Sequence, residues 1–356
     1  MLIAIIVIVG IAVLILGHEA GHFFVAKLFR MKVDEFGFGF PPRIKAWRPF
    51  DKAQGKKGET EYSFNWLPFG GFVKISGEEE QITNPEKLQA LPPEEKKRYF
   101  LFQPAWKRFL VIASGVLINF IIGWLLISFV FIVGTSPLVI VNGVQPNSPA
   151  EKAGITAGDI IKNYPSSGDF KNFIDENRGK QTTFEIVRGG KDLKFTAVPK
   201  ISTGPNEGAF GVEFSEAGIE RQKFFPALVS GFKESILICE ATVSAFYELF
   251  KNLLVHGSLM AGVVGPVGIF VVAEQTGHIG LIYLLQLLGL ISLNLAVLNL
   301  IPFPALDGGR LFLIILEKVK GAPVSIKTQS LINGVGFAAL LFLMAIITVR
   351  DVVNLF

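Results

Sequence analysis

Long apolar runs separated by polar stretches are the main feature of this chain. Four of them are long enough to cross a hydrocarbon layer of about 30 Å as helices. They cover residues 2–25, 107–134, 281–301 and 330–349. A fifth apolar stretch, 258–273, contains three glycines and Pro266, which favour a broken or re-entrant segment over a straight helix. The pattern predicts a polytopic α-helical membrane protein with four transmembrane helices.

Between the first two spans the apolar period changes to two. Phe36, Phe38 and Phe40 alternate with glycines, and residues 62–67 alternate again before a stretch with Pro and Gly. This pattern predicts a β hairpin within residues 33–77, and the aromatic content is typical of a membrane surface. The alternative is an amphipathic loop packed on the helices.

The stretch between the second and third spans predicts a small α+β domain. Strand-like segments occur at 138–141, 160–161, 183–188 and 193–198, and a short helix is expected near 170–177. The segment is long enough for a single core. After it, residues 224–255 carry apolar residues at helical spacing with charges between them. They predict one or two amphipathic helices along the outer membrane surface.

Composition supports the membrane class. Half of the 356 residues are hydrophobic, the mean hydropathy is +0.48 and only 18% are charged. The net charge of +4 does not indicate nucleic-acid binding, because the charges lie in loops between apolar spans. Cys239 is the only cysteine, so neither an intrachain disulfide nor a cysteine-rich zinc site is possible.

Loop charges predict the orientation in the membrane. Residues 27–108 carry 16 Lys and Arg against 11 Asp and Glu, whereas residues 135–280 carry 13 against 15. The first loop is therefore expected in the cytoplasm. Both termini and the α+β domain are then extracytoplasmic, and the protein lies in the cell inner (cytoplasmic) membrane. No positive charge precedes the first apolar run, so we expect a retained span and not a signal peptide.

The first span contains the chain's most informative motif, His18-Glu19-Ala20-Gly21-His22. On a helix the two histidines lie one turn apart on one face, so both imidazoles can bind one zinc ion while Glu19 acts as a base. Lone ionisable groups inside a membrane are costly, which favours a metal or water-filled site over a chance match. This combination indicates metalloprotease chemistry.

Catalytic zinc sites usually have three protein ligands, so a third is expected. Asp307 is the candidate, because it follows an apolar span interrupted by Pro302 and Pro304. Gly308 and Gly309 let the backbone come close to the metal site or a facing helix. The alternative role for Asp307 is a helix cap.

The membrane depth of these residues agrees with a shared site. His18 lies about 25 Å along a helix that enters from outside, and Asp307 follows a span that returns to the cytoplasmic face. A crossing by residues 258–273 would place Asp307 on the opposite side. The metal hypothesis therefore predicts that this stretch does not cross.

Taken together, these motifs give the chain a family resemblance over nearly its whole length. The segment from His18 to His22, the segment from Asn299 to Arg310, and Gly265-Pro266-Val267-Gly268 resemble the site-2 proteases, which are intramembrane zinc metalloproteases. The most similar branch is the bacterial regulator-of-sigma-E type. The resemblance implies that His18, His22 and Asp307 bind Zn²⁺ and that Glu19 is the general base.

The resemblance also implies substrate contacts. Asn299 and Pro302 would contact substrate, as would Phe69, Gly70 and Gly71 in a membrane-associated β loop that pairs with an extended chain. Where the family commonly has Gly-Pro with a downstream Asn, this sequence has Ser114-Gly115-Val116 with Asn119, which leaves that segment without an assigned role.

The resemblance divides the chain into four parts. Residues 1–134 and 281–356 form the two halves of the protease core, and 215–280 hold the amphipathic helices and the re-entrant segment. Residues 138–214 form one PDZ-like domain. We expect this domain to filter substrates by size and to bind peptide at a strand edge near 138–141.

Expected partners are the lipid bilayer and transmembrane segments of single-span proteins, and the resemblance implies anti-sigma factors or remnant signal peptides as substrates. Two other functions stay open. One is a catalytically silent scaffold that binds membrane helices, against which the presence of Glu19 argues. The other is a zinc transporter, against which the absence of repeated halves argues. The sequence does not indicate an oligomeric state.

Overall fold

The computed structural model describes residues 2–51, 56–78, 88, 90–204, 208–256, 264–322 and 324–353. It contains two compact units. The first comprises the chain up to Ile127 together with Phe232–Phe270 and Leu287 onward, and the second comprises Ser128–Gly231 and Val271–Gln286. Each unit is described by itself.

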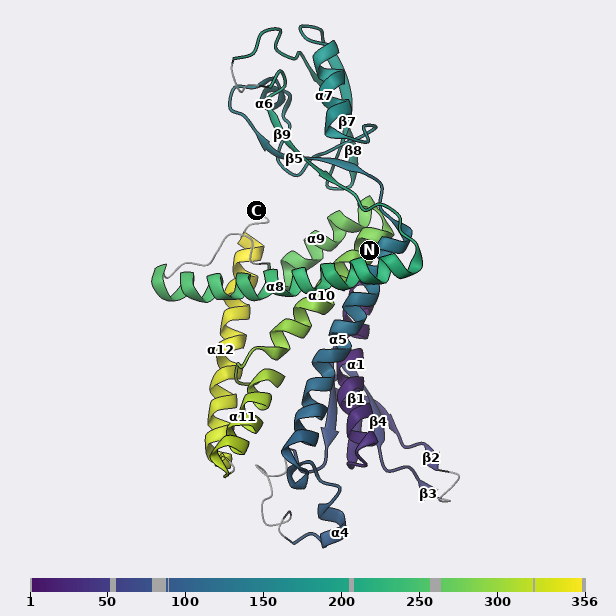
Figure 1. Cartoon of the computed structure of the whole chain (residues 1–356), viewed down its shortest axis with the longest axis vertical. Coiled ribbons are helices and arrows are strands. Elements are labelled where there is room, and N and C mark those ends of the chain that lie inside the picture. Colours follow the sequence, from purple (N-terminus) through teal and green to yellow (C-terminus); the bar gives the residue numbers. More distant parts are fainter. Residues whose placement is uncertain are drawn as a thin grey trace. The chain divides into compact units, whose positions relative to one another are not determined.

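Four helices among the described residues are long and apolar enough to span a membrane (Figure 1). They are α1 (Leu2–Leu28), α5 (Ala105–Val133), α10 (Leu281–Leu300) and α12 (Ile326–Val353). The four predicted spans are therefore confirmed, with ends that differ from the predicted ones by a few residues. Continuous apolar runs form helices in lipid because a helix satisfies its own backbone hydrogen bonds.

Glycines on α1 allow its neighbours to approach closely. A methyl group on Gly21 would lie 2.6 Å from the carbonyl oxygen of Ser114 on α5, and one on Gly10 would lie 2.7 Å from the Leu288 side chain on α10. Small residues let backbones pack against each other where apolar burial alone gives no preference. The HExxH turn of α1 thus lies directly against α5.

The predicted hairpin is a folded sheet made from two long strands, β1 (Val33–Trp47) and β4 (Glu61–Ile75). Register shifts let Glu35–Phe38 pair with two parts of β4, Gly71–Lys74 on one side and Glu61–Phe64 on the other. The short strands β2 (Phe50–Asp51) and β3 (Lys56–Lys57) pair with each other. Because β1 and β4 pair along most of their length, the aromatic segment is a β hairpin and the loop alternative is wrong. Both strands also contact α1.

The segment after α10 turns sharply into α11 (Asp307–Lys320). Phe303 donates to the carbonyl oxygen of Ile301 at 2.6 Å, and Ala305 has a left-handed φ of 71°. A side chain on Gly308 or Gly309 would collide with the backbone of Ile301 or Phe303. The two glycines therefore allow this tight turn directly after Asp307, and their predicted role in a close approach to the metal site or a facing helix stays a prediction.

Polar contacts hold α12 and α8 (Phe224–His256) to other helices of the first unit. Asp351, which is 9% exposed, accepts a 2.8 Å hydrogen bond from the backbone of Gly268 in the first turn of α9 (Pro266–Ile279). Thr242 on α8 donates to Asn294 on α10 at 2.7 Å. Two shorter helices, α4 (Pro93–Lys96) and the 3₁₀ turn η1 (Phe100–Phe102), precede α5.

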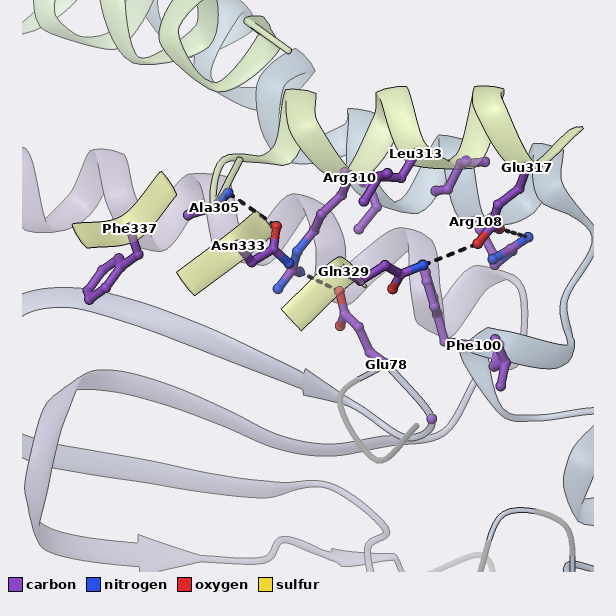
Figure 2. A pocket seen from close by; sticks show the side chains of 14 residues that line it. Glu78, Phe100, Arg108, Ala305, Arg310, Leu313, Glu317, Gln329, Asn333 and Phe337 are labelled. Carbon is purple, nitrogen blue, oxygen red and sulfur yellow. Dashed lines mark hydrogen bonds and ion pairs between the residues drawn. The ribbon is translucent and has the colours of Figure 1, made fainter. Parts of the chain in front are cut away.

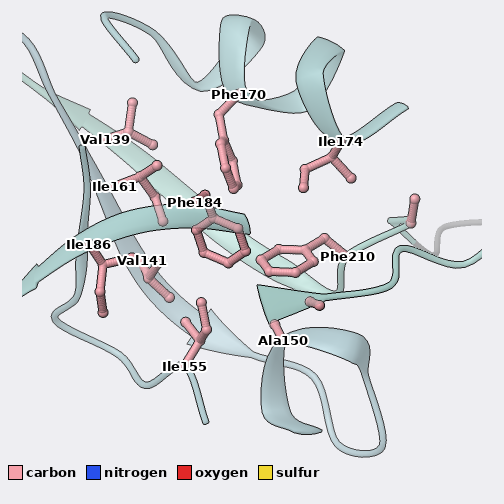
Figure 3. Packing of buried hydrophobic residues seen from close by; sticks show 12 residues of the cluster. Val139, Val141, Ala150, Ile155, Ile161, Phe170, Ile174, Phe184, Ile186 and Phe210 are labelled. Atoms are coloured by element: carbon pink, nitrogen blue, oxygen red, sulfur yellow. The ribbon is translucent and has the colours of Figure 1, made fainter. Parts of the chain in front are cut away.

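The second unit contains an antiparallel five-stranded sheet in the order β8-β7-β6-β5-β9. The strands are β5 (Leu138–Val144), β6 (Ile160–Ile161), β7 (Thr182–Arg188), β8 (Lys191–Ala197) and β9 (Val212–Ala217). Helices α6 (Pro149–Ala153) and α7 (Ser167–Glu176) accompany it. Figure 3 shows the core, where Phe170 of α7 lies edge to face with Phe184 and Phe210.

The structure corrects two sequence expectations in this region, the peptide-binding edge and the end of the domain. The peptide edge expected near 138–141 is wrong, because β5 pairs with both β6 and β9. Strand β9 runs to Ala217, beyond the predicted domain end at 214. Part of the stretch 258–273 lies outside the described residues, and its later part is the start of α9.

Candidate metal centre and active site

Three side chains from the two ends of the chain converge within the first unit. The Asp307 Oδ2 atom lies 3.0 Å from His18 Nε2 and 3.2 Å from His22 Nε2, and the two Nε2 atoms are 3.2 Å apart. Both histidines are buried and the Asp307 side chain is 14% exposed. Among the described residues, these are the only three His, Cys, Asp or Glu side chains grouped closely enough to hold a metal ion.

The spacing of the three atoms matches a shared ion. Ligands held about 2.0–2.1 Å from zinc at tetrahedral angles are about 3.3 Å from each other. The three observed separations are all slightly shorter than this value, so small outward movements would fit zinc between the atoms. The sequence expectation that His18, His22 and Asp307 share one site agrees with this geometry.

Hydrogen bonding to His22 also indicates a cation. Its Nδ1 atom lies 2.8 Å from the Val111 carbonyl oxygen, which can only accept, so Nδ1 carries the proton. In the neutral ring, Nε2 then presents a lone pair to Asp307 Oδ2, and that oxygen is buried without a hydrogen-bond donor. Two facing electron pairs repel unless a cation lies between them, which is the arrangement of a metal site.

Asn119 of α5 plays the corresponding part for His18. Its amide lies 3.4 Å from His18 Nδ1, and its Oδ1 atom is buried without a partner. A half-turn of the side-chain amide exchanges the positions of its oxygen and nitrogen atoms, and the hydrogen-bond partners decide between the two orientations. With Oδ1 toward His18, the oxygen accepts the Nδ1 proton and leaves Nε2 free to bind metal. One rotation therefore satisfies both groups.

Gly115 of α5 makes room for the two imidazoles. A methyl group at this position would lie 2.5 Å from His22 Nε2 and 2.7 Å from His18 Cε1. Such distances are shorter than any normal contact, so the metal-binding face of α1 tolerates only glycine here. Neither Gly115 nor Asn119 was given a role from the sequence, although their spacing of four residues, one helical turn, was a usable signal.

The proposed base lies against the sheet. A methyl group on Gly71 would be 3.2 Å from Glu19 Cγ and 3.2 Å from the Gly37 carbonyl oxygen, so β4 passes directly beside Glu19. Gly70 is buried and has a φ of 124°, a conformation that side chains disfavour. The side chain of Phe69 lies outside the described residues. Strand β4 thus brings Gly71 to the site and carries Gly70 next to it.

The other two predicted substrate residues lie on the way from α10 to α11. Asn299 is half-buried in the last turn of α10, and Pro302 is exposed in the following turn. Arg310 follows Asp307 by one helical turn, and it is close enough to Glu19 for their charges to interact. The structure therefore places the segment of Asn299 and Pro302 directly before Asp307, the candidate third ligand.

Comparisons with known proteins agree with the geometry. A family model, Peptidase family M50, matches residues 6–343. The chain belongs to peptidase family M50. A provisionally named zinc metalloprotease of Clostridium perfringens is 32% identical over 97% of both chains. The regulator of sigma-W protease RasP of Bacillus subtilis is 24% identical over 99% of this chain and 98% of its own.

Family membership and the four apolar helices together make this M50 peptidase a multi-pass membrane metalloprotease. The family acts on membrane-protein substrates in the bilayer. The recognition of the site-2 protease family from the two paired motifs is thereby confirmed.

Proposed function

We propose that the chain is a zinc-dependent intramembrane endopeptidase that hydrolyses peptide bonds within transmembrane segments of single-span proteins. The observation that carries this proposal is the convergence of His18, His22 and Asp307 on one point, with both histidines inside an apolar span. Anti-sigma factors and remnant signal peptides are the proposed substrate classes. The name of RasP, which refers to sigma-W, supports the first of these.

Zinc is the ion that two imidazoles and one carboxylate suit, and the relatives named as zinc metalloproteases support the choice. When bound, it polarises the scissile carbonyl and makes a water molecule acidic enough to act near neutral pH. Val111 and Asn119 hold the two rings in the tautomers that leave Nε2 available. These contacts prepare the ligands before the ion arrives.

Glu19 is proposed as the general base. Its position between the two histidines in the HExxH turn places its carboxylate beside their ligand face, and Gly71 leaves that carboxylate room on the sheet side. It takes the proton of the attacking water and passes it to the amine of the leaving chain. Glu19 is half-buried on α1, and β4 contacts this helix, so the strand limits the access of bulk water to the carboxylate.

The substrate must present an extended backbone, since a helix hides its amides in internal hydrogen bonds. We propose that it adds as a strand beside residues 71–75 of β4. Among the described strands, this segment pairs only with residues 33–38 of β1, so its other edge can accept a partner. Because Gly71 lies at Glu19, an added strand passes close to the base. Asn299 and Pro302 are proposed to contact the same substrate.

The sheet of the second unit is proposed to be a PDZ-like domain at 138–214, on the extracytoplasmic side with both termini. Loop charges support this orientation. The domain is proposed to exclude substrates with bulky ectodomains. Its candidate peptide edge is β9, since among the described strands β9 pairs only with β5.

Co-expression with a tagged single-span protein tests the proposal. The intact chain should release a shortened tagged fragment, and Glu19→Gln should keep zinc and release none, because an amide cannot accept the water proton. Cleavage by both chains would refute the role of Glu19. If neither chain cleaves a panel of single-span proteins while both retain one zinc per chain, the result favours the scaffold.

A further inference from the structure

An ion pair joins the helix of the Asp307 ligand to the end of the sheet. Arg310 Nη1 on α11 donates to Glu78 Oε1 at 2.5 Å. The Glu78 side chain is 13% exposed and that of Arg310 is 41% exposed. Figure 2 shows the two side chains pointing toward each other, and both line a cavity of about 430 Å³. The mechanism above does not use this pair.

The two partners lie close in sequence to the two halves of the active site. Arg310 follows Asp307 by one helical turn. Glu78 follows β4, whose last residue is Ile75 and whose Gly71 lies beside Glu19. The pair therefore links the strand edge proposed for substrate to the helix that carries the third metal ligand.

The helix has a separate anchor at its other end. Glu317, two turns after Arg310, lies 3.1 Å from Arg108 of α5 and accepts a 3.3 Å hydrogen bond from Gln329 of α12. Both of these contacts are visible on the far side of the same cavity in Figure 2. Because Glu317 fixes α11 independently, loss of the Arg310 contact leaves the helix in place. The end of β4 also stays folded, since Ile75 is buried in one cluster with Leu311 and Ile314 of α11 and the Ser76 backbone bonds to Lys32 and Phe100. The ion pair can therefore affect only the fine position of the residues around Glu78.

We propose that the Arg310–Glu78 pair is a positioning device that holds the β4 edge where it binds the substrate strand beside the proposed metal ligands. This rests on the proposed function. Glu78 acts through β4 and touches no reacting atom. Arg310 also lies close enough to Glu19 for their charges to interact, so a change in kcat is expected from Arg310→Gln alone, while the change in KM is shared by both variants. A partly exposed ion pair contributes only about 1 kcal/mol to folding, so its loss should leave the fold intact.

The test is a double-mutant cycle of Arg310→Gln, Glu78→Gln and both together, in detergent-purified enzyme that cleaves a transmembrane substrate. We expect each single variant to raise KM about fivefold, with unchanged zinc content and a Tm lowered by no more than about 4 °C. The KM of the double variant should be no higher than that of either single variant, because each single change already breaks the shared ion pair. Additive effects of the two changes on KM would overturn the proposal. Loss of zinc from the single variants, or a larger fall in their Tm, would also overturn it.

The chain offers a matched control. Arg43 Nη2 and Glu35 Oε1 form a 2.6 Å pair within the sheet, and their side chains are 46% and 14% exposed, close to the values for Arg310 and Glu78. This pair does not reach α11, so Arg43→Gln should leave KM unchanged. A KM increase in Arg43→Gln as large as that in Arg310→Gln would mean that any sheet charge has this effect, and the proposal would fall.

A second measurement reports the distance between β4 and α11 directly and does not depend on enzymatic activity. Spin labels at Lys74 on β4 and Val319 on α11, both exposed, would be introduced in a Cys239→Ser background. Arg310→Gln should broaden the distance distribution between the labels, whereas Arg43→Gln should not. An unchanged distribution in Arg310→Gln would overturn the proposal even if KM rises. Failure of the proposed function is distinguished from these outcomes, because the unsubstituted enzyme would then show no cleavage to compare.

Discussion

The Nδ1 atom of His22 on α1 donates to the backbone carbonyl oxygen of Val111 on α5, at 2.8 Å and in the interior of the protein. A backbone carbonyl cannot be removed by substitution of its side chain, so the tautomer of His22 is fixed by the path of α5. His18 instead depends on Asn119, a side chain that can be changed. The two ligands therefore respond differently to mutation.

Removing the Asn119 amide should weaken the metal site through His18. We expect Asn119→Ala to lower zinc affinity about 10- to 100-fold, because His18 loses the partner that holds its tautomer and orientation. Competition with a chromophoric chelator measures the affinity. Asn294→Ala is the matched control, since Asn294 contacts Thr242 and not a ligand. Equal affinities for Asn119→Ala and the unsubstituted chain would contradict this role.

Replacing Asp307 should remove one ligand while keeping the fold. Asp307→Asn should lose zinc on dialysis against a chelator and should not cleave substrate, because a neutral amide is a poor ligand for a divalent ion. Metal analysis before and after dialysis gives the answer. Full zinc retention by the variant would exclude Asp307 as a ligand.

A single methyl group on α5 should disrupt catalysis. Gly115→Ala places the methyl group against both imidazoles, and a ligand shift of about 1 Å can cost about 100-fold in rate. The control is Gly334→Ala on α12, where an added methyl meets no atom within 4 Å. It should be as active as the original chain. Comparable turnover by the two variants would show that the space at Gly115 is not required.

The second unit has a buried carboxylate whose loss should be felt locally. Asp159 is 1% exposed and accepts bonds of 2.7 and 2.6 Å from Arg188 and 2.9 Å from the Thr156 backbone. Since Arg188 is partly exposed, we expect Asp159→Asn to cost about 2 kcal/mol. Hydrogen exchange in β6 and β7 should then be about 30-fold faster.

Its control is Asp192→Asn, which breaks the exposed pair with Lys162 and should change exchange little. If the two aspartate variants exchange at the same rate, burial of Asp159 does not contribute the expected stability.

The sequence predicted the spans and the three candidate ligands for a physical reason. Apolar length and the cost of ionisable groups in lipid are local properties that can be read along the chain. His18 and His22 are linked by helical spacing, and Asp307 was reached by depth in the membrane. Each of these steps needs only the length, composition and order of the segments, and not the way in which they pack.

The missed features depend on pairs of segments. Gly115 and Asn119 acquire their roles only from the crossing of α5 and α1, and the double pairing of β1 requires register shifts that alternation does not encode. Strand β5 was expected at an edge because β9, its second partner, lies far along the chain. The glycines around Pro266 were read as helix breakers, but Gly268 also approaches Asp351, 83 residues later.

The three proposed ligands come from distant parts of the polypeptide, with two on α1 and one at the start of α11. A ribosome inserting this chain into a membrane releases the histidines and Glu19 first, and the carboxylate only after most of the protein has been made. Until then the nascent chain has an incomplete ligand set and cannot retain a catalytic ion. The order of synthesis therefore delays completion of the proposed ligand set until most of the chain has been made.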